Sequence, residues 1–244
     1  TCGTSQLFKQ NEMNPIVKNI PNSITCINLA AGCMAIVAAA HAYDPLWGLM
    51  AFQWAFIFIA VGAVADFFDG FAARALHAYS NLGKELDSLC DLVTFGVAPA
   101  MIMFNLLAAQ QPGSWICWAA LLIPVAGAIR LARFNIDTRQ TTSFIGLPIP
   151  ANAIFWIGYA ALMSQGVDFL AEWYCFIPVL CVECWLMNSP LRMFSLKIKH
   201  FSFKDNAPQL LLIVAAAVFC FTLGVAGLLW LIVFYILLSV AFRK

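Results

Sequence analysis

The segment "LWGLMAFQWAFIFIAVGAVADFFDGFAARALHAYSNLGKELDSLCD", residues Leu46–Asp91, combines two patterns that decide the fold. Its first part, Leu46–Ala65, contains no charged side chain. A helix of about 20 predominantly apolar residues is long enough to cross the hydrocarbon core of a membrane. The second part, Asp66–Asp91, holds five acids, one arginine and one lysine. The segment therefore predicts a membrane-spanning helix that runs into an acidic region.

The composition of the whole chain supports a membrane protein. Hydrophobic residues make up 63% and charged residues 10% of the chain, with a mean hydropathy of +0.86, whereas soluble domains have about 25% charged residues. The 244 residues leave no room for a separate soluble domain beside the spans. We expect a single transmembrane domain over residues 13–244, preceded by a disordered or appended leader at 1–12. A net charge of +1 gives no sign of nucleic acid, and we expect no such partner.

Eight apolar stretches alternate with short polar, Pro or Gly breaks, and they are residues 23–41, 46–65, 88–109, 115–133, 150–165, 169–187, 208–223 and 225–242. With eight crossings, all thirteen lysines and arginines fall on one side. Basic residues gather in cytoplasmic loops. The sequence therefore predicts an all-α, polytopic transmembrane helical bundle of about eight spans, with both termini cytoplasmic. The division between the last two stretches, at Leu223-Gly224, is the least marked.

The acidic region contains four aspartates in two pairs, Asp66 with Asp69 and Asp87 with Asp91. Spacings of three and four place each pair on one face of its helix. A short turn at residues 80–83 makes the two helices antiparallel neighbours. We therefore expect the four carboxylates to converge at one depth, at the cytoplasmic end of the second and third spans.

Four carboxylates this close together need cations, because like charges repel strongly in a low dielectric. The pairs contain only oxygen ligands and no histidine, which favours hard ions such as Mg²⁺, Mn²⁺ or Ca²⁺. Two such ions on four carboxylates are typical of phosphoryl transfer. A polar helix interface, an ion or transport pathway and a solvated loop are alternative explanations of the same residues.

Small residues beside the aspartates are compatible with a phosphate ligand. Gly70 and Ala73 follow the first pair and Gly83 precedes the second, so a bulky substrate can approach the backbone closely. Arg74 lies one helical turn beyond Gly70 and offers a fork of donors to phosphate oxygens. We expect the first of these helices to continue through Arg74 and the second to begin near Gly83.

These positions form the pattern D-x2-D-G-x2-A-R-x8-G-x3-D-x3-D, at Asp66, Asp69, Gly70, Ala73, Arg74, Gly83, Asp87 and Asp91. The pattern resembles the signature of the CDP-alcohol phosphotransferase family, and all eight positions match. The resemblance implies an integral membrane enzyme in which an alcohol displaces CMP from a CDP-linked lipid, with divalent metals bound by the aspartates.

The resemblance also implies roles for the individual residues. Asp66, Asp69 and Asp87 would hold two Mg²⁺ or Mn²⁺ ions, which Ca²⁺ can replace in a crystal. Asp91 would be both a metal ligand and the base that takes the proton of the attacking hydroxyl. The signature residues that would contact the CDP portion are Gly70, Ala73, Arg74 and Gly83. We expect direct transfer without a covalent enzyme intermediate.

Three further segments bear on the acceptor alcohol. Ile20–Gly32, Arg130–Asn135 and Phe144–Ala153 resemble the corresponding stretches of the bacterial and archaeal phosphatidylserine synthases in this family. The residues after about 165 resemble the family only in being hydrophobic spans. The resemblance implies that CDP-diacylglycerol is the donor and L-serine the acceptor.

Polar residues in these segments are additional candidates. Asn22, Thr25 and Asn28 open the first span and either line the nucleotide site or cap the helix, since Asn and Ser commonly start helices. Arg130, Arg133 and Asn135 end the fourth span and are candidates for binding serine or the lipid phosphate. The two arginines either bind the serine carboxylate and the lipid phosphate or anchor the helix at the membrane interface.

Several alternatives remain open at the level of the sequence. Glycerol phosphate or an inositol compound could replace serine as the acceptor, because the aspartate signature does not distinguish these alcohols. An ion-binding transporter could also place aspartates in a helical bundle. The family resemblance further implies a homodimer in contact with membrane lipid, in the cell (inner) membrane, with the active site facing the cytoplasm.

Overall fold

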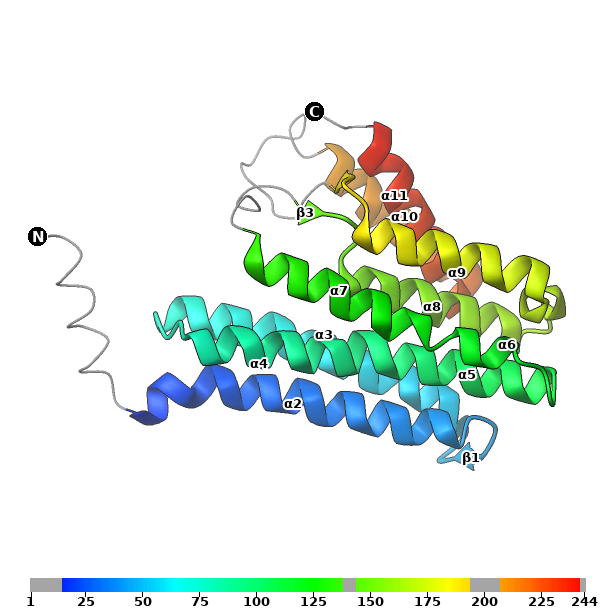
Figure 1. The fold of residues 1–244 in the computed structure, drawn as a ribbon, viewed down its shortest axis with the longest axis horizontal. Coiled ribbons are helices and arrows are strands. Elements are labelled where there is room, and N and C mark those ends of the chain that lie inside the picture. Colours follow the sequence, from blue (N-terminus) through cyan, green and yellow to red (C-terminus); the bar gives the residue numbers. More distant parts are fainter. Residues whose placement is uncertain (1–14, 138–143, 194–206, 242–244) are drawn as a thin grey trace, which may run out of the picture.

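The computed structural model describes residues 15–137, 144–193 and 207–241, which are mostly helical (Figure 1). The predicted leader at 1–12 lies outside the described residues. The helices are α2 (Pro15–Ala40), α3 (Ala51–Ala75), α4 (Asn81–Asp91), α5 (Ala98–Gln110), α6 (Ile116–Ala119), α7 (Leu122–Ile136), α8 (Ile149–Ser164), α9 (Trp173–Asn188), α10 (Ala207–Leu223) and α11 (Gly227–Ala241). Shorter elements are the π-helical segment η1 (Leu92–Val97), the 3-10 turns η2 (Asp168–Ala171) and η3 (Gly224–Ala226), and the strands β1 (Pro45–Leu46), β2 (Leu49–Met50), β3 (Phe144–Ile145) and β4 (Arg192–Met193).

Among the described residues, five helical segments are long and apolar enough to cross a membrane, and they are Asn19–Ala40, Ala51–Ala75, Asn81–Gln110, Ile116–Ile136 and Pro208–Ala241. The helices α8 and α9 are also apolar, with 16 residues each. Pro208–Ala241 does not form one continuous helix, because Gly224 has a φ of +59° and separates α10 from α11. The chain is therefore an all-α membrane protein, and the predicted break near Gly224 is present.

The helices α2, α3 and the α4–α5 rod run alongside one another, and α7, α8 and α9 lie beside them (Figure 1). The helix α11 packs on α8, and α10 packs on α11 at the edge of the bundle. The start of α2, the end of α3, the start of α4 and the end of α7 all lie at one end of the molecule, on the left of Figure 1. This end carries the aspartates.

The two aspartate pairs lie on the helices that the sequence predicts. The helix α3 continues through Arg74 to Ala75, and the chain turns at His77, which has a φ of +51°. Ser80 begins α4 by accepting a hydrogen bond on Oγ from the backbone N–H of Gly83 at 2.9 Å. The continuous helix over Asn81–Gln110 has 30 residues, a length of about 45 Å against a hydrocarbon core of about 30 Å. Its polar first turns therefore extend beyond that core.

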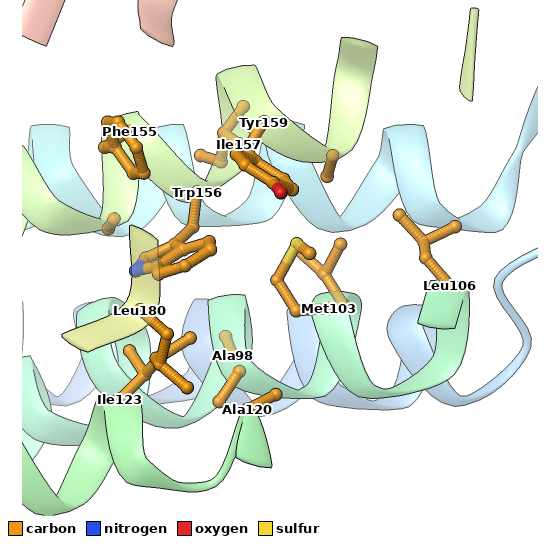
Figure 2. Packing of buried hydrophobic residues seen from close by; sticks show 14 of the residues in the cluster. Ala98, Met103, Leu106, Ala120, Ile123, Phe155, Trp156, Ile157, Tyr159 and Leu180 are labelled. Carbon is orange, nitrogen blue, oxygen red and sulfur yellow. The ribbon is translucent and has the colours of Figure 1, made fainter. Parts of the chain in front are cut away.

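The apolar core is centred on α8, whose side chains are buried on several faces. Figure 2 shows Trp156 extending from α8 towards Leu180 of α9, Ile123 of α7 and Ala98 of α5. The indole Nε1 of Trp156 donates to Asn152 Oδ1 at 3.0 Å, so its polar atom is satisfied inside the core. This packing fixes α7 and α9 against α5, which continues the rod that begins with α4 and carries Asp87 and Asp91.

Candidate active site

Three of the four aspartates form a compact cluster. Asp66 and Asp69 lie on α3 and Asp87 on α4, and each offers one carboxylate oxygen within 4.8 Å of the other two. Two buried oxygens, Asp69 Oδ2 and Asp87 Oδ1, have no hydrogen-bond partner within the part of the chain that is described. Buried carboxylate oxygens without a partner are costly unless a cation compensates them. The donor set consists only of oxygens, and it fits a hard divalent cation.

Asp91 lies on α4, one turn beyond Asp87, and its carboxylate is bound by a residue of another helix, α2. Its Oδ1 accepts a hydrogen bond at 3.1 Å from the side-chain Nδ2 of Asn28 on α2. Asn28 is fully buried and Asp91 is only 9% exposed. The bond restrains the rotation of the Asp91 carboxylate, and Asp66 interacts with the same carboxylate.

Asn28 does not line the small cavity described below, where the sequence analysis expected it to contact the nucleotide. Its position is fixed by Thr94, whose Oγ1 donates to the backbone carbonyl oxygen of Asn28 at 3.0 Å. Thr94 belongs to the π-helical segment η1 directly after Asp91, and such segments often occur at functional sites. It packs against Gly32 and Gly62, where any Cβ would collide with it. Two glycines therefore let α2 and α3 close around Thr94.

The role of this bond leads to a prediction for Asn28. Asn28→Leu removes the donor to Asp91 but breaks no other side-chain hydrogen bond, because Asn28 Oδ1 has no partner among the described residues. We expect kcat to fall roughly 10- to 100-fold, as for partners that orient catalytic ligands, with little change in the thermal unfolding temperature. The matched control is Asn105→Leu, which removes a bond to the Met101 carbonyl elsewhere in the bundle. Equal kcat values for the two variants would contradict the role of Asn28.

A small cavity of about 220 Å³ opens between α2, α3 and α4, beside the aspartate cluster. It is lined by most of the residues that the sequence analysis assigned to CDP and phosphate, together with two of the aspartates: Asn22, Thr25, Asp69, Gly70, Ala73, Arg74, Gly83 and Asp87. Its lining also includes Lys84, which adds a second cation beside Arg74. The small cavity can therefore take an anionic group next to the cluster.

Gly83 and Gly70 both line the small cavity, but the absence of a side chain has a different consequence at each position. A Cβ at Gly83 would lie 2.9 Å from Asn22 Oδ1 and 3.0 Å from Ser80 Oγ, so this glycine permits the close approach of α2 to α4. A Cβ at Gly70 would meet only Arg74 Nη1, at an ordinary contact distance of 3.7 Å. Packing therefore does not require a glycine at position 70, and the absence of a side chain there leaves more of the small cavity open.

A large cavity of about 550 Å³ lies between the ends of α7 and α9 and is lined by Arg130 and Arg133. Arg130 is 8% exposed, lies over the Phe134 ring at 5.3 Å, and is close enough to Asp91 for the two charges to interact. Arg133 Nη1 donates to the backbone carbonyl of Asn188 on α9 at 3.2 Å. A guanidinium buried this deeply beside an open cavity is a strong site for an anionic ligand.

Asn135 lines neither cavity, although the sequence analysis grouped it with the two arginines. Its side-chain Nδ2 donates to Ser88 Oγ at 3.0 Å and to Glu85 Oε2 at 3.3 Å, both on α4. Lys84 Nζ donates to its backbone oxygen at 2.8 Å. Asn135 therefore connects the end of α7, which lines the large cavity, to α4, which lines the small one.

The two cavities are related to the aspartates in different ways. Asp69 and Asp87 line the small one, whereas Asp91 lines neither but interacts electrostatically with Arg130, which lines the large one. Thr94, Lys84 and Asn188 are parts of this site that were not predicted from the sequence. Lys84 could have been found from the sequence, since it directly follows Gly83 of the signature. No motif directly adjoins Thr94 or Asn188.

Comparison with known proteins gives a consistent picture. The family model described as CDP-alcohol phosphatidyltransferase matches residues 18–185, more than half of the chain. This region contains all four aspartates, the small cavity and both arginines of the large cavity.

Individual relatives carry the name CDP-diacylglycerol--serine O-phosphatidyltransferase. The protein from Mycobacterium leprae is 36% identical over 183 residues, 72% of this chain and 56% of its own length. The Bacillus subtilis protein is 42% identical over 131 residues, 54% of this chain and 69% of its own length. The Methanocaldococcus jannaschii protein is 33% identical over 146 residues, covering 60% and 62%. The chain therefore spans little more than half of the first of these relatives.

Proposed function

This chain belongs to the CDP-alcohol phosphatidyltransferase family, and from that membership we propose that it transfers the phosphatidyl group of CDP-diacylglycerol to the hydroxyl of L-serine, releasing CMP. The observation that carries the proposal is the cluster of Asp66, Asp69 and Asp87, two of which line the small cavity together with the signature residues Gly70, Ala73, Arg74 and Gly83. The names of the relatives support serine as the acceptor.

The aspartate cluster suits divalent metal ions. Asp66, Asp69 and Asp87 would hold two Mg²⁺ or Mn²⁺ ions, with Asp91 as a further ligand. Carboxylate oxygens of the first three lie within 4.8 Å of one another, which supports this role. When bound, such ions supply positive charge to the pyrophosphate oxygens and to the departing CMP.

The small cavity would receive the CDP portion of the lipid. Arg74 and Lys84 line it together with Gly70, so two cations meet the phosphates and no side chain at position 70 blocks their approach. Asn22 and Thr25 line the same cavity from α2 and can hydrogen-bond the nucleotide. Ala73 lies among them, where its small side chain leaves the space open.

The large cavity would receive serine, with its hydroxyl directed to Asp91. Asp91 takes the hydroxyl proton, and the serine Oγ forms a bond to the phosphorus that carries the diacylglycerol. The bond between that phosphorus and the bridging pyrophosphate oxygen breaks, and this oxygen leaves with CMP and the electron pair. Arg130, close to Asp91, would hold the lipid phosphate or the serine carboxylate during transfer. The reaction is direct, without a phosphatidyl-enzyme intermediate.

We further propose eight membrane crossings with both termini cytoplasmic, in the cell (inner) membrane, and a site open to the cytoplasm. The crossings are α2, α3, the α4–α5 rod, α6 with α7, and each of α8 to α11. Arg74, Lys84, Arg130 and Arg133 lie at the aspartate end of the bundle, as expected for the cytoplasmic side. A homodimer is the assembly that we expect from the family.

The proposal is tested by the acceptor dependence of CMP release. Purified protein in detergent is given CDP-diacylglycerol and Mn²⁺ or Mg²⁺, with L-serine, glycerol 3-phosphate or inositol in parallel reactions. We expect release with L-serine at least about tenfold faster than with the other two, a factor that corresponds to about 1.4 kcal/mol of discrimination. Faster release with another alcohol would keep the family and overturn the acceptor. Release with none of them would refute the transferase reaction.

A further inference from the structure

The C-terminal helix α11 lies behind one wall of the large cavity and outside residues 18–185, which match the family model. It contacts β4, which pairs with β3, and Ile145 of β3 lines the large cavity. From α11, Tyr235 lies close enough to the Arg130 guanidinium for the two groups to interact electrostatically. Tyr235 is only 5% exposed and does not itself line the large cavity, whereas Arg130 does. Any effect of Tyr235 on a ligand must therefore act through Arg130.

Close packing fixes α11 and, with it, the position of Tyr235. A Cβ at Gly158 of α8 would collide with the backbone of Leu229, so this glycine permits α11 to lie directly against α8. Further along α11, Ser239 Oγ donates to the Tyr235 backbone carbonyl at 2.8 Å, and both residues are buried. Because a buried side chain in a close-packed interior has little freedom to change rotamer, Tyr235 presents its phenol group to Arg130 in one direction.

Arg130 itself has few restraints from the protein. Arg133 is anchored by its hydrogen bond to the Asn188 carbonyl, whereas Arg130 donates no hydrogen bond within the part of the chain that the structure describes. Its guanidinium lies over the Phe134 ring, a contact that holds the cation near the ring without fixing the direction of its N–H donors. Asp91 attracts the same guanidinium from α4. Without a further neighbour, the donors of Arg130 would turn towards Asp91 and away from a ligand.

We propose that Tyr235 is a positioning residue, which keeps the donors of Arg130 directed into the large cavity, where they bind an anionic group of a substrate. The inference rests on the proposed function and adds to it a residue that the family resemblance does not cover. Asp91 and Tyr235 belong to α4 and α11, which lie on different sides of α7 (Figure 1). The phenol oxygen carries partial negative charge and attracts the guanidinium, so it opposes the pull of Asp91. Arg130 then remains available to a ligand.

The first test measures anion binding, with inorganic phosphate as the probe. The thermal unfolding temperature of the purified protein in detergent is followed against phosphate concentration, at fixed ionic strength and without divalent metal. We expect the phosphate concentration for half-maximal stabilisation to rise at least about fivefold in Tyr235→Phe, which removes only the hydroxyl. The matched control is Tyr159→Phe, which removes another buried hydroxyl, bound to the Leu170 carbonyl, and leaves the phosphate dependence unchanged. Equal phosphate dependence in Tyr235→Phe and the unmodified protein would overturn the inference.

Phosphate binding does not depend on turnover, so this test separates the inference from the proposed function. Failure of the proposed function has a different result, namely no serine-dependent CMP release by the unmodified protein.

The kinetic constants show which substrate supplies the anion and whether Tyr235 acts through Arg130. Arg130→Lys keeps the charge but loses the fork of donors, and it should raise the KM for L-serine or that for CDP-diacylglycerol. Tyr235→Phe should raise the same KM at least about fivefold, while kcat changes less than about threefold. When residue 130 is already lysine, Tyr235→Phe should change that KM by less than about twofold, whereas two independent effects would multiply. Effects that multiply would show that Tyr235 does not act through Arg130.

Discussion

Asp91→Asn is expected to lower kcat for serine-dependent CMP release by about 10²- to 10⁴-fold, the range attributed to a positioned general base. The amide cannot accept the hydroxyl proton of serine. The bond from Asn28 can survive, because the new side chain keeps one carbonyl oxygen for Asn28 Nδ2. We therefore expect the variant to fold like the unmodified protein.

The binding of CDP-diacylglycerol distinguishes this loss from general damage to the site. Asp91 does not line the small cavity, and Asp66, Asp69 and Asp87 keep their carboxylates, so at saturating Mn²⁺ the variant should still bind CDP-diacylglycerol with an affinity within about threefold of the unmodified protein. Asp44→Asn, in the loop before α3, is a suitable control and should keep full activity. Substantial turnover by Asp91→Asn, above about a tenth of the normal rate, would exclude Asp91 as the base.

Asp87→Asn is expected to act through metal binding. It removes one of the three carboxylates whose oxygens lie within 4.8 Å of one another, and loss of a charged ligand weakens a hard divalent ion strongly. We expect the Mn²⁺ concentration for half-maximal activity to rise at least about tenfold, with a large loss of kcat at physiological metal concentrations. A Mn²⁺ titration of CMP release measures both effects.

In the absence of metal, Asp87→Asn is expected to make the folded protein more stable. Three clustered carboxylates repel one another in the absence of cations, so removal of one should raise the thermal unfolding temperature in the presence of a chelator. Added Mn²⁺ should then stabilise the unmodified protein more than Asp87→Asn, because binding to the folded state alone stabilises it. If Mn²⁺ shifts both proteins equally, Asp87 is not a ligand.

The local features of the site could be predicted from the sequence because they follow from helical spacing. Residues three or four apart share a face, and the turn at residues 80–83 is short, so Asp66, Asp69 and Asp87 had to meet once α3 and α4 formed. The signature glycine at 83 also marks a close approach, which the structure explains by Asn22 and Ser80.

Contacts between distant segments could not be predicted in this way. Asn28 and Asp91 are 63 residues apart, and the packing of Thr94 against Gly32 and Gly62 helps to bring them together. The π-helical register of η1, which presents Thr94, has no recognisable sequence pattern. The large cavity needs the end of α9, where Asn188 lies beyond the residues that carry the resemblance. Its shape depends on how α7, α8 and α9 pack, and hydrophobic periodicity does not determine that packing.

The central claim is that the aspartate site joins the hydroxyl of serine to the phosphatidyl group of CDP-diacylglycerol. The most direct test supplies the purified protein with CDP-diacylglycerol, Mn²⁺ and L-serine that carries a heavy oxygen isotope in its hydroxyl group, and analyses both products by mass spectrometry. The account predicts phosphatidylserine that retains the isotope, unlabelled CMP, and equal amounts of the two products. Release of CMP without labelled phosphatidylserine would contradict it.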